Sequence, residues 1–311
     1  KLLFIDTETT GLAGGAGTYV FLIGLGYFSR SSFIIKQYFL TDLTGEKELL
    51  KIFREEIKRH QNFVTYNGKS YDIPLLRARS IFLKMRIDLS KMGNIDLLHL
   101  SRRFWRDKLE EFTLQNIERQ ILNVKRKEGF DISGSAIPDA YFDYLETRNA
   151  KFMKNIIYHN QKDILSLVLI MEQMNTLLYK LPKDLAKKKL NYFEIGRLYL
   201  LYGNKEKAIQ IFEDILSKDK CHAGALKKLS FIYKRAGNYR RAVELWEIGA
   251  ENDQIYAHKE LAKWEEHTNK DYKKALAWTL KAIQIQEISP FVKIKVIKEL
   301  SHREKRLRSK L

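Results

Sequence analysis

Four carboxylates and one histidine have the types and the spacing expected of a site that cleaves phosphodiester bonds. They occur in three separate apolar segments of the chain, as Asp6 with Glu8, as Asp72, and as His159 with Asp163. Phosphodiester hydrolysis builds charge on the attacking and leaving oxygens, and two divalent cations about 3.5–4 Å apart can stabilise both. Hard cations prefer carboxylate oxygens. We therefore predict that Asp6, Glu8, Asp72 and Asp163 bind two divalent cations, Mg or Mn.

The first segment, residues 2–12, predicts a buried strand with two acids on one face. Its apolar run is typical of a central strand, and the two-residue period of a strand places Asp6 and Glu8 on the same side. No Lys or Arg lies between Lys1 and Arg30 to neutralise them. Because buried acids without partners are costly, bound cations explain this pair more simply than a structural ion pair does.

The second segment places Asp72 at the start of a helix. A short apolar strand and an Asn67-Gly68 turn precede it, and Pro74 fits the first turn of the helix that follows. The alternative is that Asp72 only caps the helix by accepting a backbone N–H hydrogen bond.

The third segment predicts a helix, with apolar residues at helical spacing through Leu169 and Ile170. His159 and Asp163 lie four residues apart and therefore share one helix face. If Asp163 binds a metal ion, His159 is close enough to take a proton from the attacking water. The alternative is a packed, hydrogen-bonded His and Asp pair without a catalytic role.

Together these segments resemble the DEDD superfamily of 3′→5′ exonucleases, and within it the YprB-like ribonuclease-H-like domains that carry a C-terminal helical-repeat region. The resemblance rests on residues 4–12, 66–72 and 159–167 in that order, with residues 96–105 between them. It implies a 3′→5′ exonuclease that acts on DNA in repair. It also implies nucleic-acid contacts by residues of the first two motifs, namely Thr9, Gly11, Leu12 and Asn67.

The last motif departs from the family pattern, which leaves two candidates for the general base. The histidine branch usually places His five residues before the last Asp, and the tyrosine branch places Tyr four before it. Here His159 has the four-residue spacing and Tyr158 the five-residue spacing. We prefer His159, because imidazoles titrate near neutrality, whereas a phenol has an unperturbed pKa of about 10.

Composition limits the class of protein. The chain has 311 residues and 45% apolar content, without a run near the roughly 18 apolar residues of a membrane span. The single cysteine, Cys221, excludes an internal disulfide, and no secretory signal pattern opens the chain, so we expect a cytoplasmic protein. Because the chain starts at Lys1, one residue before its first strand, we also expect a segment upstream of it.

The formal charge of +18 predicts a polyanionic partner, because Lys and Arg that neutralise phosphates supply most non-specific affinity for nucleic acid. Residues 1–180 carry +6 of this charge and residues 181–311 carry +12. The alternative is a basic surface that serves solubility.

Three arginines surround a tryptophan in the middle of the chain, and they are also candidates for nucleic-acid contact. Arg102, Arg103 and Arg106 could meet a phosphate backbone while Trp105 stacks a base. Packing of the tryptophan on the helix surface is the alternative, and we favour it.

The order of predicted elements indicates two domains. Strands over residues 2–9, 19–28 and 33–40, a helix over 46–60, and then a strand and a helix are the opening order of a ribonuclease-H-like fold. We predict an α/β ribonuclease-H-like mixed sheet with flanking helices over residues 1–180. An all-α tetratricopeptide-like helical repeat domain follows over residues 181–311.

The repeats show in residues that recur in kind 34 positions apart, the tetratricopeptide period. The two sets are Gly196, Tyr199, Gly203, Ala208 and Phe212, and then Ser230, Tyr233, Gly237, Ala242 and Trp246. A third unit over residues 256–286 is degenerate, because Glu265 or Glu266 stands where the first-helix tyrosine belongs. A basic helix over residues 290–310 would cap the stack.

Two further functions stay open. A catalytically silent scaffold could bind nucleic-acid ends while the repeats hold a protein partner such as a helicase, although the intact acid set argues against it. An exoribonuclease is the other alternative, because the sequence does not reveal contacts to the 2′-hydroxyl of RNA.

Overall fold

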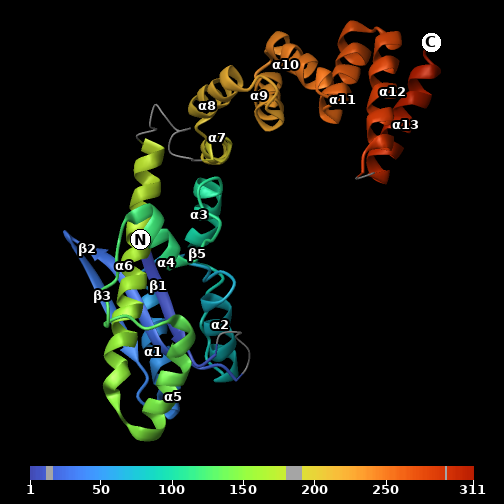
Figure 1. Ribbon diagram of the computed structural model, residues 1–311. Coiled ribbons are helices and arrows are strands. Elements are labelled where there is room, and N and C mark those ends of the chain that lie inside the picture. The colour runs from blue at the N-terminus through green and yellow to red at the C-terminus, as the bar shows by residue number, and fades with distance from the viewer. Residues whose placement is uncertain (12–16, 180–190, 291–292) are drawn as a thin grey trace. The chain divides into compact units, whose positions relative to one another are not determined.

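The computed structural model describes residues 1–11, 17–179, 191–290 and 293–311. The chain forms two compact units, Lys1–Leu190 and Asn191–Leu311 (Figure 1). The predicted domain boundary at residues 180 and 181 falls within 180–190, outside the described residues. Each unit has buried hydrophobic clusters of its own.

The N-terminal unit is built on a mixed five-stranded sheet, as predicted. The strand order is β3-β2-β1-β4-β5. β1 is antiparallel to β2, and β2 to β3, whereas β1, β4 and β5 run parallel. The strands are β1 (Leu2–Thr9), β2 (Val20–Ser29), β3 (Ser32–Phe39), β4 (Asn62–Thr65) and β5 (Gly93–Asp96).

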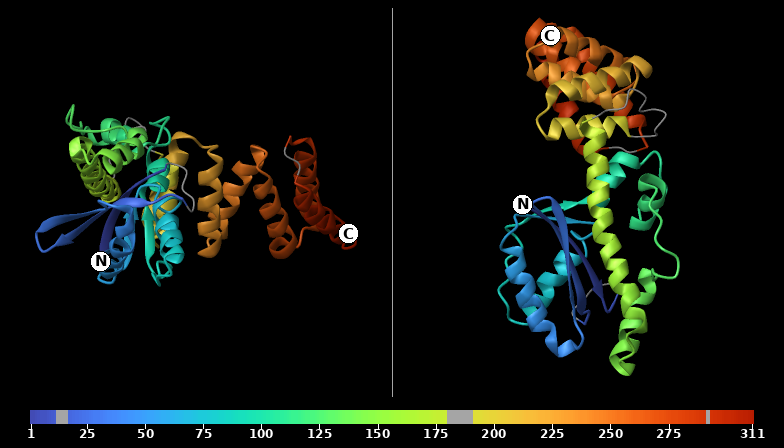
Figure 2. Two further views of the ribbon diagram at one scale, coloured as in Figure 1. Left: turned by 90° about the horizontal axis from the view of Figure 1, so that it is seen from below. Right: turned by 90° about the vertical axis from the view of Figure 1, so that its left-hand side faces the viewer.

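Helices cover both faces of this sheet, which explains why the first half of β1 and most of β2 are apolar on both faces. α1 (Glu46–Ile57) and α6 (Met153–Tyr179) lie on opposite faces (Figure 2). On the α1 side, Leu3 and Ile5 belong to one buried cluster with Phe53. The alternation of β1 therefore turns Asp6 and Glu8 toward the α6 side.

Four shorter α-helices lie in the described part of this unit. α2 begins at Asp72 with Pro74 in its first turn, as predicted, and Arg79 of α2 forms a buried ion pair with Glu46 of α1, Nη2 to Oε2 at 2.5 Å. This pair fixes the helix that carries Asp72. The four helices are α2 (Asp72–Phe82), α3 (Leu97–Trp105), α4 (Leu114–Ile117) and α5 (Ile137–Thr147).

Gly24 of β2, which has no side chain, lets α6 approach β1 and its acids closely. Gly24 pairs with Asp6 across the β1–β2 register. A Cβ at Gly24 would lie 2.1 Å from Oδ1 of Asn160 and 2.5 Å from Cδ1 of Ile164, both on α6. Only glycine therefore allows this close contact between strand and helix.

The C-terminal unit consists of helices that contact one another in sequence order, which confirms the predicted run of helices. Gly203 and Gly237, 34 residues apart, both adopt positive φ, of 81° and 76°. Ala208 and Ala242 are both fully buried. These equivalences support a 34-residue repeat, and its tetratricopeptide type stays a prediction. The helices are α7 (Tyr192–Leu201), α8 (Lys205–Lys218), α9 (Ala223–Arg235), α10 (Tyr239–Glu251), α11 (Ile255–Trp264), α12 (Tyr272–Ile288) and α13 (Ile294–Arg308).

Glu266, at the degenerate position of the third unit, is a buried anchor for α13. Its carboxylate pairs with Arg303 at 2.6 Å, Arg306 at 2.8 Å and Lys310 at 3.1 Å, and its side chain is 0% exposed. Part of the positive charge of the last helix is therefore neutralised inside the unit.

No described helix is long and apolar enough to cross a membrane.

Candidate active site

Asp6 is held near the C-terminal end of β1 by an amide from α6. Nδ2 of Asn160 donates to Oδ2 of Asp6 at 2.8 Å and to the Asp6 carbonyl at 3.2 Å. Oδ1 of Asn160 accepts from Nε2 of Gln37 at 2.9 Å, which fixes the orientation of the amide. Burial, followed by the charge of Asp163, raises the pKa of Asp6 well above its usual value.

The four predicted ligands act on one another electrostatically. Burial, and then the charges of Asp163 and Asp72, raise the pKa of Glu8 well above its usual value. Burial also raises the pKa of Asp163, which the nearby His159 and Arg126 partly offset. A cluster of carboxylates with raised pKa values is a site that gains strongly from a bound cation.

Asp72 does not cap α2, and its carboxylate bonds to a side chain of β1 instead. Tyr71, not Asp72, occupies the N-cap position of α2. The Asp72 carboxylate accepts a hydrogen bond from the hydroxyl of Thr7, on the face of β1 opposite to Asp6 and Glu8. Burial raises the pKa of Asp72 to about 6, against the opposing effect of Thr7. The simple capping alternative is therefore wrong.

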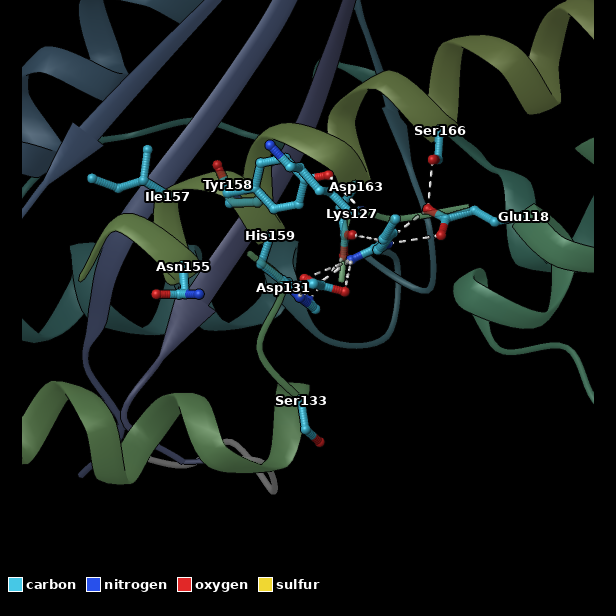
Figure 3. A network of polar contacts seen from close by, with 12 residues as sticks. Glu118, Lys127, Asp131, Ser133, Asn155, Ile157, Tyr158, His159, Asp163 and Ser166 are labelled. Carbon is cyan, nitrogen blue, oxygen red and sulfur yellow. Dashed lines mark hydrogen bonds and ion pairs between the residues drawn. The ribbon is translucent and has the colours of Figure 1, made fainter. Parts of the chain in front are cut away.

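An arginine distant in the sequence enters this cluster. Nη2 of Arg126 donates to Oδ1 of Asp163 and, at 2.6 Å, to Oε1 of Glu118. Oε1 of Glu118 also accepts from the hydroxyl of Ser166 at 2.6 Å (Figure 3). Arg126 comes from the segment between α4 and α5, and its ion pair is with Asp163, not with Asp6 or Glu8, the acids for which the sequence offered no nearby cation.

His159 is oriented by a second acid. Its Nδ1 lies 2.8 Å from Oδ1 of Asp131 and 3.2 Å from Nη1 of Arg126 (Figure 3). Donation to Asp131 requires the proton on Nδ1, so in the neutral ring Nε2 is free to accept a proton. Nε2 lies 3.6 Å from Oδ2 of Asp163. This is the arrangement that orients a general base.

Tyr158, the alternative base, is engaged elsewhere. Its hydroxyl accepts a hydrogen bond from the backbone N–H of Lys127 at 3.0 Å. Its ring packs edge to face with Phe130, with the centroids 6.2 Å apart. The geometry therefore favours His159 as the base, and the assignment stays a prediction.

The donor chemistry of the cluster fits hard divalent cations, because carboxylate oxygens are the ligands that Mg and Mn prefer. In the part of the chain that the structure describes, no three His, Cys, Asp or Glu side chains stand in position to hold a metal ion. Asp163 is paired with Arg126, and Asp72 accepts a hydrogen bond from Thr7. Ion binding would therefore require Asp163 to exchange partners.

Two sets of hydrogen bonds hold the residues of the first two motifs that are predicted to contact nucleic acid, and the contacts themselves stay a prediction. The Tyr71 hydroxyl donates to the Gly11 carbonyl and lies 2.9 Å from Oγ1 of Thr9. The backbone N–H of Asn67, a residue with φ of 62°, donates to Oδ1 of Asp96 at 2.9 Å. Leu12, also predicted, lies outside the described residues.

Trp105 is buried, whereas the three arginines around it are exposed. Trp105 is 2% exposed, so it packs inside the unit and does not stack a base. Arg102, Arg103 and Arg106 are all exposed. Their contact with nucleic acid stays a prediction.

Four residues that matter to the site carried no recognisable signal in the sequence. Arg126 lies in a Lys-Arg-Lys run that resembles an ordinary solvated surface, and Asn160 stands beside His159 in a motif whose other members have the more obvious chemistry. Glu118 and Asp131 lie in segments without a clear periodic pattern.

Comparison with known proteins agrees with this architecture. Residues 3–175 match a family model described as RNase_H superfamily. The chain is 31% identical over 282 residues to the uncharacterized protein YprB of Bacillus subtilis (strain 168), covering 89% of this chain and 67% of that protein. Over 102 residues it is 30% identical to a DNA polymerase of Methanocaldococcus jannaschii, covering 26% of this chain and 6% of that protein.

Among solved structures, the family B DNA polymerase from the archaeon Pyrobaculum calidifontis has a TM-score of 0.49 and 12% identity, covering 99% of this chain and 50% of that one. The assignment of a family rests instead on the family model and on the likeness to YprB. Because that model spans more than half of the chain and the likeness extends over most of both proteins, the chain belongs to the RNase H superfamily.

Proposed function

We propose that the protein is a metal-dependent 3′→5′ exonuclease of the DEDD type that acts on DNA, in DNA repair. The observation that supports the proposal most is that the charges of Asp163, Glu8 and Asp72 raise the pKa of buried Asp6, beside a histidine that is hydrogen-bonded to Asp131. Two bound divalent cations, Mg or Mn, would stabilise the charge that develops on the attacking and leaving oxygens. The 3′→5′ polarity comes from the resemblance to the DEDD superfamily.

The chain's own residues have separable roles in this proposal. Asn160 holds the Asp6 carboxylate in one orientation. In the tautomer with the proton on Nδ1, His159 donates to Asp131 and Nε2 can take the proton of the attacking water. Burial of the carboxylates strengthens every charge interaction that they make.

The net charge of +18 suits a polyanion of either kind. DNA is preferred over RNA as the substrate because one partial relative is a DNA polymerase. The basic helical repeats would add affinity for nucleic acid or hold a protein partner such as a helicase.

A second candidate function is a catalytically silent protein that binds nucleic-acid ends. The ion pair of Arg126 with Asp163 favours it, because this contact already engages one of the four proposed ligands.

One assay separates these functions. DNA and RNA strands of the same sequence, labelled at the 5′ end, are incubated with the protein and Mn²⁺ or Mg²⁺, and product lengths are followed with time. The proposal expects a descending ladder on DNA. Faster degradation of RNA would indicate the exoribonuclease, and tight binding with no product on either strand would indicate the silent protein.

A further inference from the structure

Arg126 is a cation that the chain itself supplies to the acid cluster. Its side chain is 9% exposed. Nε donates to Oε2 of Glu118 at 2.8 Å and Nη2 to Oε1 at 2.6 Å, a two-pronged contact, while Nη2 also donates to Asp163. Burial opposes the charge, yet the hydrogen bonds to Glu118 and the charge of Asp163 raise the pKa of Arg126 above its usual value.

The guanidinium would stay paired if it released Asp163. Glu118 satisfies it through both oxygens and is itself fixed by the hydroxyl of Ser166 at 2.6 Å. Nη1 has Asp131 at 3.4 Å on its other side. A bidentate Arg and carboxylate pair is among the strongest hydrogen-bonded pairs in proteins. The contact to Asp163 is therefore an additional one, which can be exchanged without leaving a buried charge unpaired.

Space for that exchange lies next to the site. A cavity of about 710 Å³ is lined by Arg126, Glu118 and Asp131 together with exposed residues such as Arg119. A small movement of the guanidinium into this cavity would free the Asp163 carboxylate.

We propose that Arg126 competes with a divalent cation for Asp163, so that the ion at this carboxylate binds only when the guanidinium withdraws. This inference rests on the proposed metal-dependent function. It explains how Asp163 can serve as a ligand although the structure pairs it with Arg126. Ion binding at Asp163 is weaker than ion binding at Asp6, because Arg126 must first leave Asp163, whereas the Asp6 carboxylate is held by the neutral amide of Asn160.

The test is calorimetric titration of the full chain with Mn²⁺ alone. The wild type should show a tight and a weak class of site. Arg126→Gln should tighten the weak class by about ten- to a hundredfold, the size expected for one lost charged hydrogen bond. Arg126→Lys should tighten it less, because an ammonium pairs as a point charge and cannot hold both carboxylates as the guanidinium does.

Two controls make the result readable. Arg119→Gln removes an exposed charge that lines the same cavity, and it should leave both classes unchanged. Asp6→Asn should remove the tight class, which tests the proposed function separately. Circular dichroism checks the fold, and Arg126→Lys, which keeps a charge beside Glu118, carries the test if Arg126→Gln does not fold.

The outcomes point in distinct directions. If Mn²⁺ binds the wild type and Asp6→Asn abolishes the tight class, but both Arg126 variants titrate as the wild type does, the competition is refuted and the proposed function stands. If Arg119→Gln tightened the weak class of Mn²⁺ site as much as Arg126→Gln does, the competition would also be refuted, because the loss of any nearby positive charge would then have the same effect. If the wild type binds no Mn²⁺ at millimolar concentration, the proposed function and this inference both fail.

Discussion

The guanidinium of Arg126 donates to the carboxylate of Asp163, 37 residues further along the chain, inside the cluster that carries the proposed chemistry. The site therefore contains both the acids that would bind divalent ions and a guanidinium that pairs with one of them, Asp163. This relationship makes metal binding, acid stability and the role of His159 separately measurable.

Removing the charge of Asp72 should stabilise the metal-free protein at neutral pH. Its folded-state pKa is raised to about 6 from an ordinary value of 3.8. The folded state therefore binds the proton more tightly, and stability falls as the pH rises from about 4 to about 6. In EDTA, Asp72→Asn should melt at a higher temperature than the wild type at pH 7.5 but not at pH 3.5.

Asp42, on the surface, is a control because its pKa is shifted in the opposite direction from that of Asp72. The backbone N–H of Thr44 lowers the pKa of Asp42, so this carboxylate stabilises the fold above its ordinary pKa and loses that effect in acid. Asp42→Asn should destabilise the protein at pH 7.5 and not at pH 2. If Asp72→Asn followed the same direction as Asp42→Asn, the account of the buried cluster would be wrong.

Replacing His159 should slow turnover and leave ion binding intact. Loss of a general base typically costs about 10²–10⁴ in rate, and we expect His159→Gln to fall in that range in single-turnover cleavage of labelled DNA. Asp131→Asn should also slow cleavage, because Nδ1 of His159 would lose its carboxylate acceptor at 2.8 Å. Tyr158→Phe is the matched control, and a larger loss there than in His159→Gln would identify Tyr158 as the base.

Glu266 should be essential for the attachment of α13. Glu266→Gln removes a buried charge that pairs with Arg303, Arg306 and Lys310. Breaking a buried pair costs about 3–5 kcal/mol, and we expect the lower end because Arg306 and Lys310 are partly exposed. Hydrogen exchange over residues 294–308 measures the effect. Glu265→Gln, one residue earlier, is the control, and equal protection in Glu266→Gln and wild type would contradict the anchor.

Exposed lysines of α13 should contribute to nucleic-acid affinity. Lys295 and Lys298 are exposed, whereas Arg303, Arg306 and Lys310 form ion pairs with Glu266. Each phosphate contact removed should flatten the dependence of log K on log salt by about 0.7 on single-stranded DNA. The double Gln variant is compared by fluorescence anisotropy with a control that replaces Lys47 and Lys84. Equal slopes in the two variants would assign the charge of α13 to solubility.

Much of the architecture followed from local patterns. The apolar run of β1, the Asn67-Gly68 turn and the helical period of α6 are short-range signals, and each appears where the sequence places it. The predicted helix over residues 46–60 ends earlier, at Ile57, where the N–H groups of Arg59 and His60 donate to the carbonyls of Glu56 and Ile57 and form a tight turn before β4.

The partners of the acids could not be predicted in the same way. The contact of Arg126 with Asp163 and the bond of Thr7 to Asp72 join residues that are 37 and 65 positions apart. Thr7 also lies on the opposite face of β1 from Asp6, so the period of the strand argues against its involvement. Such contacts depend on the packing of α2 and α6 against the sheet, which no local pattern contains.

The central claim is that the buried carboxylates bind the ions that drive cleavage. The most direct measurement follows 5′-labelled single-stranded DNA with Mn²⁺ in the wild type and in Asp6→Asn, with EDTA as a further control and circular dichroism to confirm folding. We predict a ladder that shortens stepwise from the 3′ end in the wild type, and no product with Asp6→Asn or EDTA. Cleavage at the wild-type rate by Asp6→Asn, or in EDTA, would contradict the account.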